Sequence, residues 1–209
     1  MDKPIIYTVG HSTHLLEYFL ELLQEYSVNC IVDVRSVAAS GYNPQYNKVP
    51  LSNFLKNNRI TYLHFAEEFG ARHNDPDLLD EDGKVDFEKV RKSWNFKKGV
   101  ERLWEGIDKK FTIALMCSES DPLDCHRFSM VSIALEKDGF EVNHILKDKT
   151  LKSNSELEMQ LLKKYDKKIP KTDIFENVSL NEQLKVAYRL RNKEIAYSPY
   201  ANEPEEKYD

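Results

Sequence analysis

The feature that most constrains the fold of this chain is a regular alternation of short apolar runs with segments of helical periodicity. The runs are rich in β-branched and aromatic residues, which favour extended structure. Strands separated by helices pair in parallel through right-handed crossovers. We therefore predict a three-layer α/β domain with a mostly parallel sheet over residues 1–148, with strands at 5–9, 29–34, 60–65, 111–116 and 140–145 and helices at 15–26, 51–58, 87–94, 96–108 and 127–138.

The pattern changes after residue 148, where the alternation of strands and helices stops. Residues 155–165 and 180–191 have helical periodicity, and residues 196–209 have the composition of a loose tail. We predict that residues 149–209 form a helical extension with a loose C-terminal tail. A chain of 209 residues suffices for one core with such an appendage, but not for two full-sized domains.

Composition narrows the classes of protein further. With 30 basic and 35 acidic residues, the net charge of −5 excludes a strongly basic nucleic-acid coat protein, although a local basic site stays open. The 3 cysteines cannot build a disulfide framework. No apolar run approaches the length of a membrane span, and the N-terminal apolar stretch is too short for a signal peptide. We expect a cytoplasmic protein that does not engage membranes. The sequence does not indicate an oligomeric state.

Polar and titratable residues follow four of the predicted strands. Ligands of open parallel sheets bind beyond the carboxyl ends of the strands, so these residues mark one candidate site. We expect this set to lie on one rim of the sheet, and the side chains of His11, Arg35, Cys117, Glu119 and Arg127 to converge in one cleft. The set comprises Gly10, His11 and Ser12, then Asp33 and Arg35, His64 and Glu67, and Cys117, Glu119, Cys125, His126 and Arg127.

The first two groups of this set have features of an anion site. Gly10, His11 and Ser12 lie between a strand and a helix, where free N–H groups and the helix dipole favour an anion. Ser12 equally suits a helix cap. Asp33 and Arg35 share one strand face, so they form either a buried ion pair or, through Arg35, a bidentate phosphate or carboxylate ligand.

The stretch from Cys117 to Arg127 carries the most chemical information. It places a thiol and a guanidinium at a helix N-terminus, where a thiolate is favoured and an oxyanion can be held. Together with His11, the residues Cys117, Cys125 and His126 could supply four zinc ligands. The seven residues between the two cysteines differ from the close cysteine pair of structural zinc sites, so we predict neither a metal nor a cofactor.

The loop over residues 40–48 carries aromatic and amide side chains. Tyr42, Asn43 and Tyr46 can stack on and hydrogen-bond to a base or sugar. The tyrosines can equally pin the loop to the domain, and the sequence leaves both interpretations open.

Several of these motifs together resemble one known family. The chain resembles the domain of unknown function 488 family over residues 5–148, through TVGHS (8–12), VDVRS (32–36), YNPQYNK (42–48), LMCSE (115–119), DPLDCHR (121–127) and VNHI (142–145). The resemblance implies a Rossmann-like α/β fold and a prokaryotic origin. It also implies that the residues at the strand ends are functional, but it supplies no reaction and no substrate.

These observations predict an enzyme, a hydrolase or transferase, that acts on a phosphorylated, nucleotide-like or nucleic-acid substrate. Arg35 and Arg127 would hold the anion, with help from the N–H groups of residues 10–12. His11 or His126 would be the general acid or base, and Cys117 would be the nucleophile. Glu119 would orient a reacting group or remove its proton. The alternative is a non-catalytic module that binds a nucleotide or nucleic acid and has a regulatory role.

Overall fold

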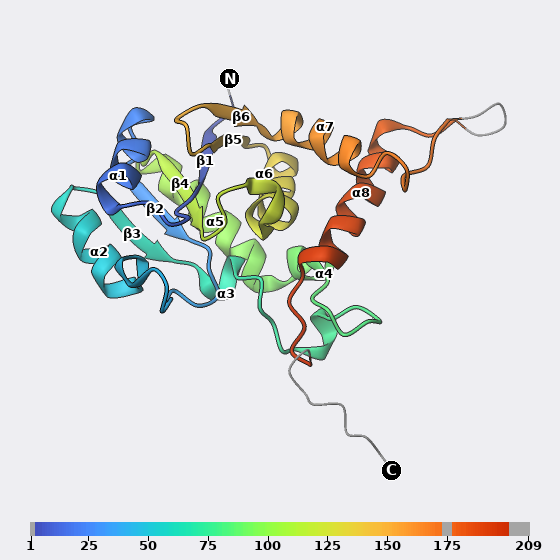
Figure 1. Ribbon diagram of the computed structural model, residues 1–209, viewed down its shortest axis with the longest axis horizontal. Helices are drawn as coiled ribbons and strands as arrows, with labels where there is room; N and C mark the ends of the chain where they lie inside the picture. Colours follow the sequence, from blue (N-terminus) through green and yellow to red (C-terminus); the bar gives the residue numbers. More distant parts are fainter. Residues whose placement is uncertain (1–2, 173–176, 201–209) are drawn as a thin grey trace, which may run out of the picture.

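A computed structural model describes residues 3–172 and 177–200 as an α/β fold built on one six-stranded sheet (Figure 1). The strand order is β3-β2-β4-β1-β5-β6, and every neighbouring pair is parallel except β5 and β6. The mostly parallel α/β architecture predicted from the sequence is confirmed. The strands are β1 (Ile5–Gly10), β2 (Cys30–Asp33), β3 (Thr61–His64), β4 (Ile113–Cys117), β5 (Glu141–Ile145) and β6 (Leu151–Ser153).

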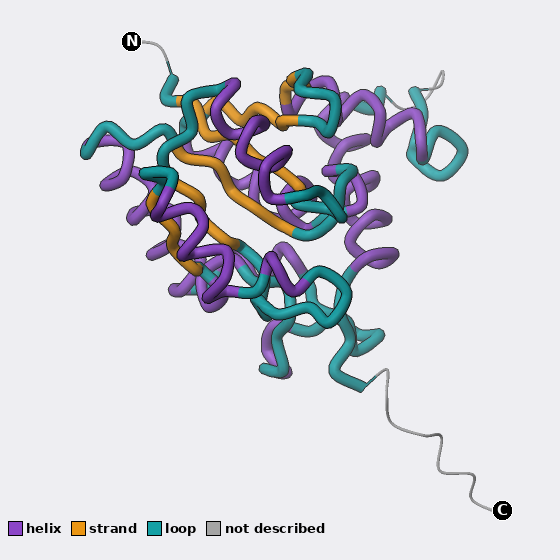
Figure 2. Tube along the Cα trace, turned by 60° about the vertical axis from the view of Figure 1, so that its left-hand side comes forward, coloured by secondary structure: helices purple, strands orange, loops and turns teal. Residues whose placement is uncertain are grey.

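Helices cover both faces of the sheet, because successive strand residues point to opposite faces and both sets are apolar. In β2, Ile31 packs with α1 (Leu16–Glu25) and α2 (Lys48–Asn57). Its neighbours Cys30 and Val32 pack on the other face with α5 (Trp94–Asp108) and α6 (Ile133–Asp138). Figure 2 shows the strands running between these two layers of helices. The second face also carries the short helices α3 (Ala66–Phe69) and α4 (Phe87–Lys92).

The C-terminal extension folds back onto the α/β domain. Helices α7 (Asn154–Lys164) and α8 (Leu180–Ile195) begin with capping boxes at Ser153 and Ser179, which satisfy their first N–H groups. Both helices pack around Phe128. Figure 1 shows them at the opposite end of the molecule from α1 and α2.

The structure differs from the sequence-based expectations at three places. The edge strand β6 was not predicted, because its three residues have little pattern of their own and gain their partners only by antiparallel pairing with β5. Helix α1 begins at Leu16 without a side-chain cap, and Ser12 adopts a positive φ of 48° instead of capping it. The predicted helix at 127–138 starts as a wide, π-helical segment, Arg127–Ser132, before α6.

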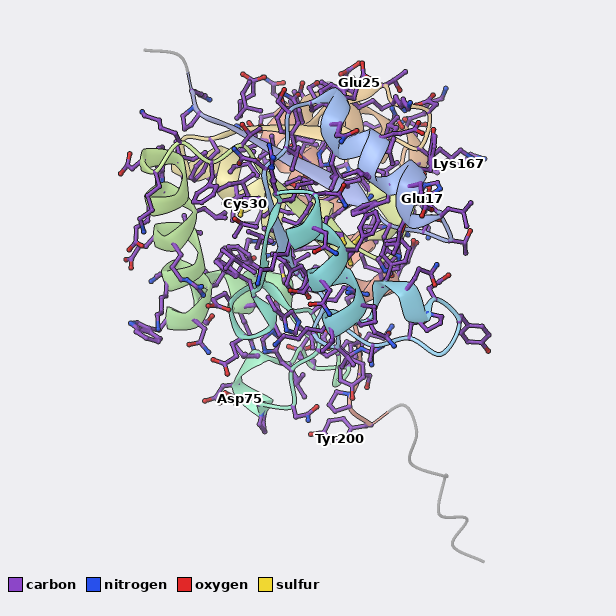
Figure 3. The ribbon with its side chains drawn as sticks, turned by 90° about the vertical axis from the view of Figure 1, so that its left-hand side faces the viewer. Glu17, Glu25, Cys30, Asp75, Lys167 and Tyr200 are labelled. Atoms are coloured by element: carbon purple, nitrogen blue, oxygen red, sulfur yellow. The ribbon has the colours of Figure 1, made fainter. Side chains whose placement is uncertain are left out.

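The first residues of the predicted loose tail are packed rather than loose. The backbone N–H of Val85 donates to the carbonyl of Tyr197, and Tyr197 also packs against the core. Figure 3 shows Tyr200 at the same end of the molecule as Asp75. Residues 201–209 of that tail lie outside the described residues. Within the described ranges, no helix combines the length and the hydrophobicity that crossing a membrane requires.

Candidate functional site

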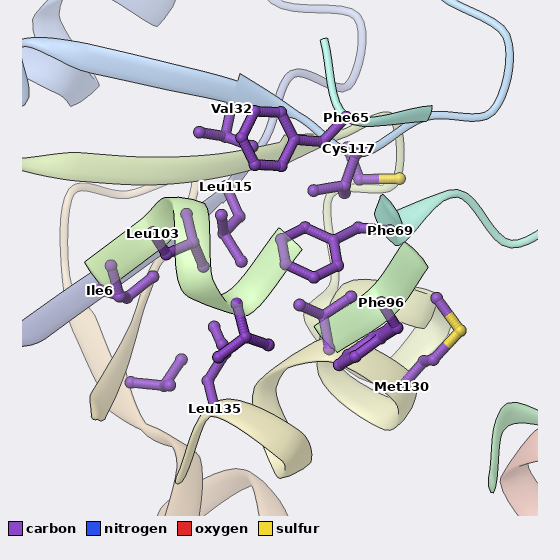
Figure 4. Packing of buried hydrophobic residues seen from close by; sticks show 14 of the residues in the cluster. Ile6, Val32, Phe65, Phe69, Phe96, Leu103, Leu115, Cys117, Met130 and Leu135 are labelled. Atoms are coloured by element: carbon purple, nitrogen blue, oxygen red, sulfur yellow. The ribbon is translucent and has the colours of Figure 1, made fainter. Parts of the chain in front are cut away.

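The carboxyl ends of β1, β2 and β4 meet at one rim, because the three strands are neighbours in the sheet. Gly10 at the end of β1 pairs with Cys117 at the end of β4, and Asp33 at the end of β2 pairs with Met116. Figure 4 shows Cys117 next to Phe65 at the margin of the hydrophobic cluster between the sheet and α5. The predicted residues at the ends of these three strands therefore share one edge of the sheet.

Four reactive side chains from β4 and the following loop are in contact at this rim. The sulfur of Cys117 lies 3.1 Å from a carboxylate oxygen of Glu119. The Nδ1 atom of His126 is 3.8 Å from the sulfur of Cys117 and 3.9 Å from that of Cys125. We call these four residues the Cys–His cluster. Both cysteines are buried, His126 is half-buried and Glu119 is exposed, so the cluster is reached from the side of Glu119.

A backbone carbonyl orients the imidazole of His126. Its Nε2 atom is 3.1 Å from the carbonyl oxygen of Val34, which follows β2. A carbonyl only accepts hydrogen bonds, so Nε2 carries a proton and Nδ1 faces the sulfurs. The backbone N–H of Arg127 donates to the sulfur of Cys125 at 3.4 Å, which stabilises negative charge on that sulfur.

The two thiols differ in their acidity. The hydrogen bond with Cys125, together with burial, raises the pKa of Cys117 well above its usual value. Burial opposes ionisation of Cys125 too, but Cys117, Arg127 and His126 outweigh it and hold the pKa of Cys125 well below its usual value. Burial lowers the pKa of His126, but the charge of Cys125 more than compensates and raises it. Burial also raises the pKa of Glu119. These directions favour Cys125 over Cys117 as the thiolate.

Arg127 lies inside the molecule, where its two terminal nitrogens donate to the protein and its Nε has no partner among the described residues. Its side chain is fully buried, and it donates to the carbonyl oxygens of Glu119 at 2.7 Å and Ser120 at 3.0 Å. The expectation that Arg127 binds an external anion is therefore not supported by its position. The guanidinium instead holds the loop that carries Glu119 against the helical segment that follows Cys125.

The N–H groups of His11 and Ser12 are also used internally. His11 donates its backbone N–H to the carbonyl of Cys117, and Ser12 donates to that of Ser118, both at 2.9 Å. The expected anion cradle at Gly10, His11 and Ser12 is therefore closed by the loop that follows β4.

The ring of His11 has partners on both nitrogens. Nδ1 donates to the carbonyl of Ser12 at 2.8 Å, and Nε2 accepts from Arg35 at 3.1 Å. Burial, with the charge of Arg35, lowers the pKa of His11 to about 4. A neutral ring with both nitrogens occupied does not favour the acid–base role expected for His11, which leaves His126 for that role.

The contact between β1 and the loop after β4 gives a prediction at Gly10. A Cβ atom there would lie 1.9 Å from the carbonyl oxygen of Glu119, which is backbone and cannot rotate away. We expect Gly10→Ala to lower the free energy of unfolding by about 2–3 kcal/mol in a chemical denaturation experiment. Gly41→Ala is the matched control, because a Cβ at Gly41 meets nothing within 4 Å. Equal stability of the two variants would contradict the close approach.

Asp33 and Arg35 form a buried ion pair, one of the two alternatives left open by the sequence. Arg35 donates from Nε at 2.9 Å and from a terminal nitrogen at 2.6 Å to the two carboxylate oxygens. Tyr62 donates its hydroxyl to the same carboxylate at 2.7 Å. The pair is neutral overall and almost excluded from solvent, so it stiffens the end of β2 and adds little net positive charge to the rim.

The three residues predicted in the loop over residues 40–48 have different environments. Tyr42 is 97% exposed, and Asn43 donates its backbone N–H to the hydroxyl of Ser40. Tyr46 is buried and stacks on His11, with the ring centroids 4.1 Å apart. Tyr46 thus pins the loop to the domain, whereas Tyr42 stands apart from the Cys–His cluster.

Two residues near the cluster were not predicted. Arg191 of α8 is buried and donates to the carbonyl of Leu123 at 2.7 Å, and it forms an ion pair with Asp124. The extension thereby holds the segment before Cys125, and no local sequence pattern predicts this contact.

The second residue, His73 in the loop after α3, donates from Nε2 to the carbonyl of Gly70. Burial lowers the pKa of His73, and the charge of His126 lowers it further.

A cavity of about 1000 Å³ lies elsewhere, between α4 and α8. Its lining includes Lys89, Tyr188 and Lys193, and none of the four residues of the Cys–His cluster. The reactive side chains and this cavity are therefore separate features of the surface.

The mostly parallel sheet, the helices on both of its faces and the polar groups at the strand ends together define a Rossmann-like α/β domain. The chain belongs to the family described as Domain of unknown function DUF488, whose model matches residues 15–133. The matched region contains β2, β4 and the whole Cys–His cluster. No curated protein and no solved structure matches the chain.

Proposed function

We propose that the protein is an enzyme, a hydrolase or transferase, that reacts through the Cys–His cluster with Cys125 as the nucleophile. The observation that carries the proposal is the position of His126 Nδ1, which faces both sulfurs while Nε2 is held by the carbonyl of Val34. A nucleophile, a base and a group that orients the base are the components of nucleophilic catalysis.

Hydrogen bonding assigns the two cysteines different parts in this proposal. The sulfur of Cys125 accepts the backbone N–H of Arg127, whereas the sulfur of Cys117 is directed at the carboxylate of Glu119. Cys125 therefore replaces Cys117, the nucleophile expected from the sequence. Glu119 is the exposed member of the cluster, and its carboxylate contacts the sulfur of Cys117 rather than that of Cys125.

The proposed reaction has two steps. The thiolate of Cys125 attacks a carbonyl carbon or a phosphorus atom of the substrate, and the leaving group departs with its electron pair and a proton from His126. In the second step, a water or an acceptor alcohol gives its proton to His126, attacks the same atom and releases the thiolate. An anionic substrate group is not held by Arg127 in this scheme, because Arg127 is fully buried and its two terminal nitrogens donate to carbonyls of the protein.

The test is turnover of chromogenic substrates, p-nitrophenyl esters and p-nitrophenyl phosphate, by the full chain in the presence of a metal chelator. We expect Cys125→Ser and His126→Ala to reduce turnover at least about 100-fold, the usual contribution of such groups. Cys30→Ala is the matched control, because Cys30 is a buried cysteine at the start of β2, outside the cluster. Equal turnover by Cys125→Ser would overturn the role of Cys125 as the nucleophile. Absence of turnover by the wild type with both substrate classes would favour the non-catalytic binding module.

A further inference from the structure

We propose that Cys117, Cys125 and His126 form a binding site for a thiophilic dication of the zinc class, and that the bound metal switches off the cysteine chemistry. The metal site itself stands on geometry. Its regulatory consequence rests on the proposed function, since only a reaction that uses the free sulfur is blocked by a metal on that sulfur.

The three ligand atoms already lie at nearly the separations that a tetrahedral ion requires. The two sulfurs and His126 Nδ1 lie within 4.8 Å of one another, with the sulfur–nitrogen distances at 3.8 and 3.9 Å. Zinc bonds of about 2.3 Å to sulfur and about 2.0 Å to nitrogen place such ligands about 3.5 Å apart. An ion between them needs only a small inward movement of the side chains.

The surroundings of His126 match those of a metal-binding histidine. Its Nε2–H donates to the carbonyl of Val34 at 3.1 Å, so the Nδ1 lone pair points at the sulfurs. A second nitrogen held by a backbone carbonyl is the usual outer contact of a metal-binding imidazole, because it sets both the tautomer and the ring orientation.

The cluster is also preorganised by contacts outside the ligands. Arg127 fixes the loop at Glu119 and Ser120, and Arg191 fixes Leu123 and Asp124 just before Cys125. The fourth position is open to water or to the exposed carboxylate of Glu119, which lies 3.1 Å from the sulfur of Cys117. Two sulfurs and an imidazole select zinc-class ions over magnesium and calcium, which prefer oxygen ligands.

The wide sequence spacing of the cysteines does not argue against this site. Close cysteine pairs are needed where a short loop alone must supply two ligands. Here β4 ends at Cys117, and the loop returns through a short 3₁₀ segment, Pro122–Asp124, to place Cys125 beside it. The sheet and the buried arginines supply the rigidity that a short spacing supplies in a zinc finger.

Metal binding has a direct consequence for the proposed reaction. On binding, the proton of the Cys117 thiol and a proton held on His126 Nδ1 are released to solvent, and the ion accepts one electron pair from each sulfur and one from Nδ1. These are the lone pairs that the reaction needs for its nucleophile and its base. The loaded protein is therefore inactive in the cysteine reaction, and both sulfurs are protected from alkylating reagents until the metal is removed.

The test uses the full chain, freed of metal by chelation, and cobalt(II) as a spectroscopic probe of zinc sites. We expect one cobalt per chain, with sulfur-to-cobalt charge-transfer absorption and the intense visible bands of tetrahedral geometry, and displacement of the cobalt by zinc. Cys117→Ser, Cys125→Ser and His126→Ala should each weaken binding at least about 100-fold, because each removes one ligand. Cys30→Ala should bind like the wild type. The absence of the charge-transfer band in the wild type would overturn the proposal, as would cobalt binding by Cys125→Ser with the affinity of the wild type.

A second measurement uses the wild-type protein only, so it does not depend on the folding of a variant. Wild-type protein is treated with iodoacetamide with and without zinc, and the labelled peptides are identified by mass spectrometry. Zinc should lower labelling of Cys117 and Cys125 at least about 10-fold and leave Cys30 unchanged. Equal labelling of the cluster cysteines would contradict the metal site. The two proposals can be refuted separately. Cobalt binding without Cys125-dependent turnover would refute the proposed enzyme function only, and Cys125-dependent turnover without cobalt binding would refute the metal site only.

Discussion

Replacing Arg127 with leucine is expected to lower the free energy of unfolding by about 3–5 kcal/mol. The fully buried guanidinium donates to the carbonyls of Glu119 and Ser120. Its removal leaves these two carbonyl acceptors without their charged donor, and each charged hydrogen bond contributes about 1.5–3 kcal/mol. Chemical denaturation followed by circular dichroism measures the loss.

Arg189→Leu is the matched control for this prediction. Arg189 lies on α8 with 64% of its side chain exposed, and its ion pair with Glu88 spans 3.8 Å at the surface. We expect a change within about 0.5 kcal/mol for this control. Arg127→Lys keeps the charge with one donor group and should show a smaller loss than Arg127→Leu, which gives a measurement even if the leucine variant does not fold. A loss below about 1 kcal/mol for Arg127→Leu would leave the arginine free for an external anion.

Acidification is expected to destabilise the protein strongly through His144. This side chain of β5 is fully buried, with Nδ1 2.8 Å from the hydroxyl of Thr8 and Nε2 3.4 Å from the amide oxygen of Asn154. Burial, followed by the charge of Arg127, lowers the pKa of His144 from 6.5 to about 3. The folded protein therefore keeps this ring neutral at pH values where the unfolded chain takes up a proton.

The direction of the effect follows from this difference in proton uptake. Above pH 6.5 both states are neutral and His144 contributes no pH dependence. As the pH falls from there toward 3, the unfolded state binds the extra proton, and stability drops by about 1.4 kcal/mol per pH unit, approaching about 5 kcal/mol in total. A loss of that size is comparable to the whole stability of many domains.

The variant His144→Gln isolates this contribution. Glutamine keeps one donor and one acceptor and does not titrate. Between pH 7 and pH 5 the wild type should lose about 2 kcal/mol more than the variant in urea unfolding experiments. Other acid-sensitive groups, such as His11, are present in both proteins and cancel in the difference. Parallel stability curves for the two proteins would refute the assignment to His144.

The framework of the sheet could be predicted because its signals are local. The strand residues of β1, β2 and β4 are short apolar runs between helical patterns, and this alternation alone implies parallel pairing. Strand β6 escaped prediction because three residues, Leu151–Ser153, carry no periodicity, and only pairing with β5 makes them a strand.

The candidate site was predictable in its location and not in its internal contacts. Residues that follow neighbouring parallel strands must meet at one edge, so His11, Arg35 and Cys117 could be grouped in advance. Arg127 faces the protein because it donates to the carbonyls of Glu119 and Ser120. These acceptors are backbone groups, which every residue has, so the sequence does not indicate which of them an arginine will contact.

Sequence alone thus determined the α/β class, the strand ends that carry polar residues and the family, because each depends on residue order along short segments. Tertiary structure alone decided the roles. It buried the side chain of Arg127, paired Arg35 with Asp33 and engaged the N–H groups of His11 and Ser12 in hydrogen bonds within the protein. It also placed His126 between two sulfurs whose cysteines are separated by seven residues along the chain. The physical reason is that a buried charge or donor takes whichever acceptor the packed core brings within reach, and distance in space is independent of spacing in sequence.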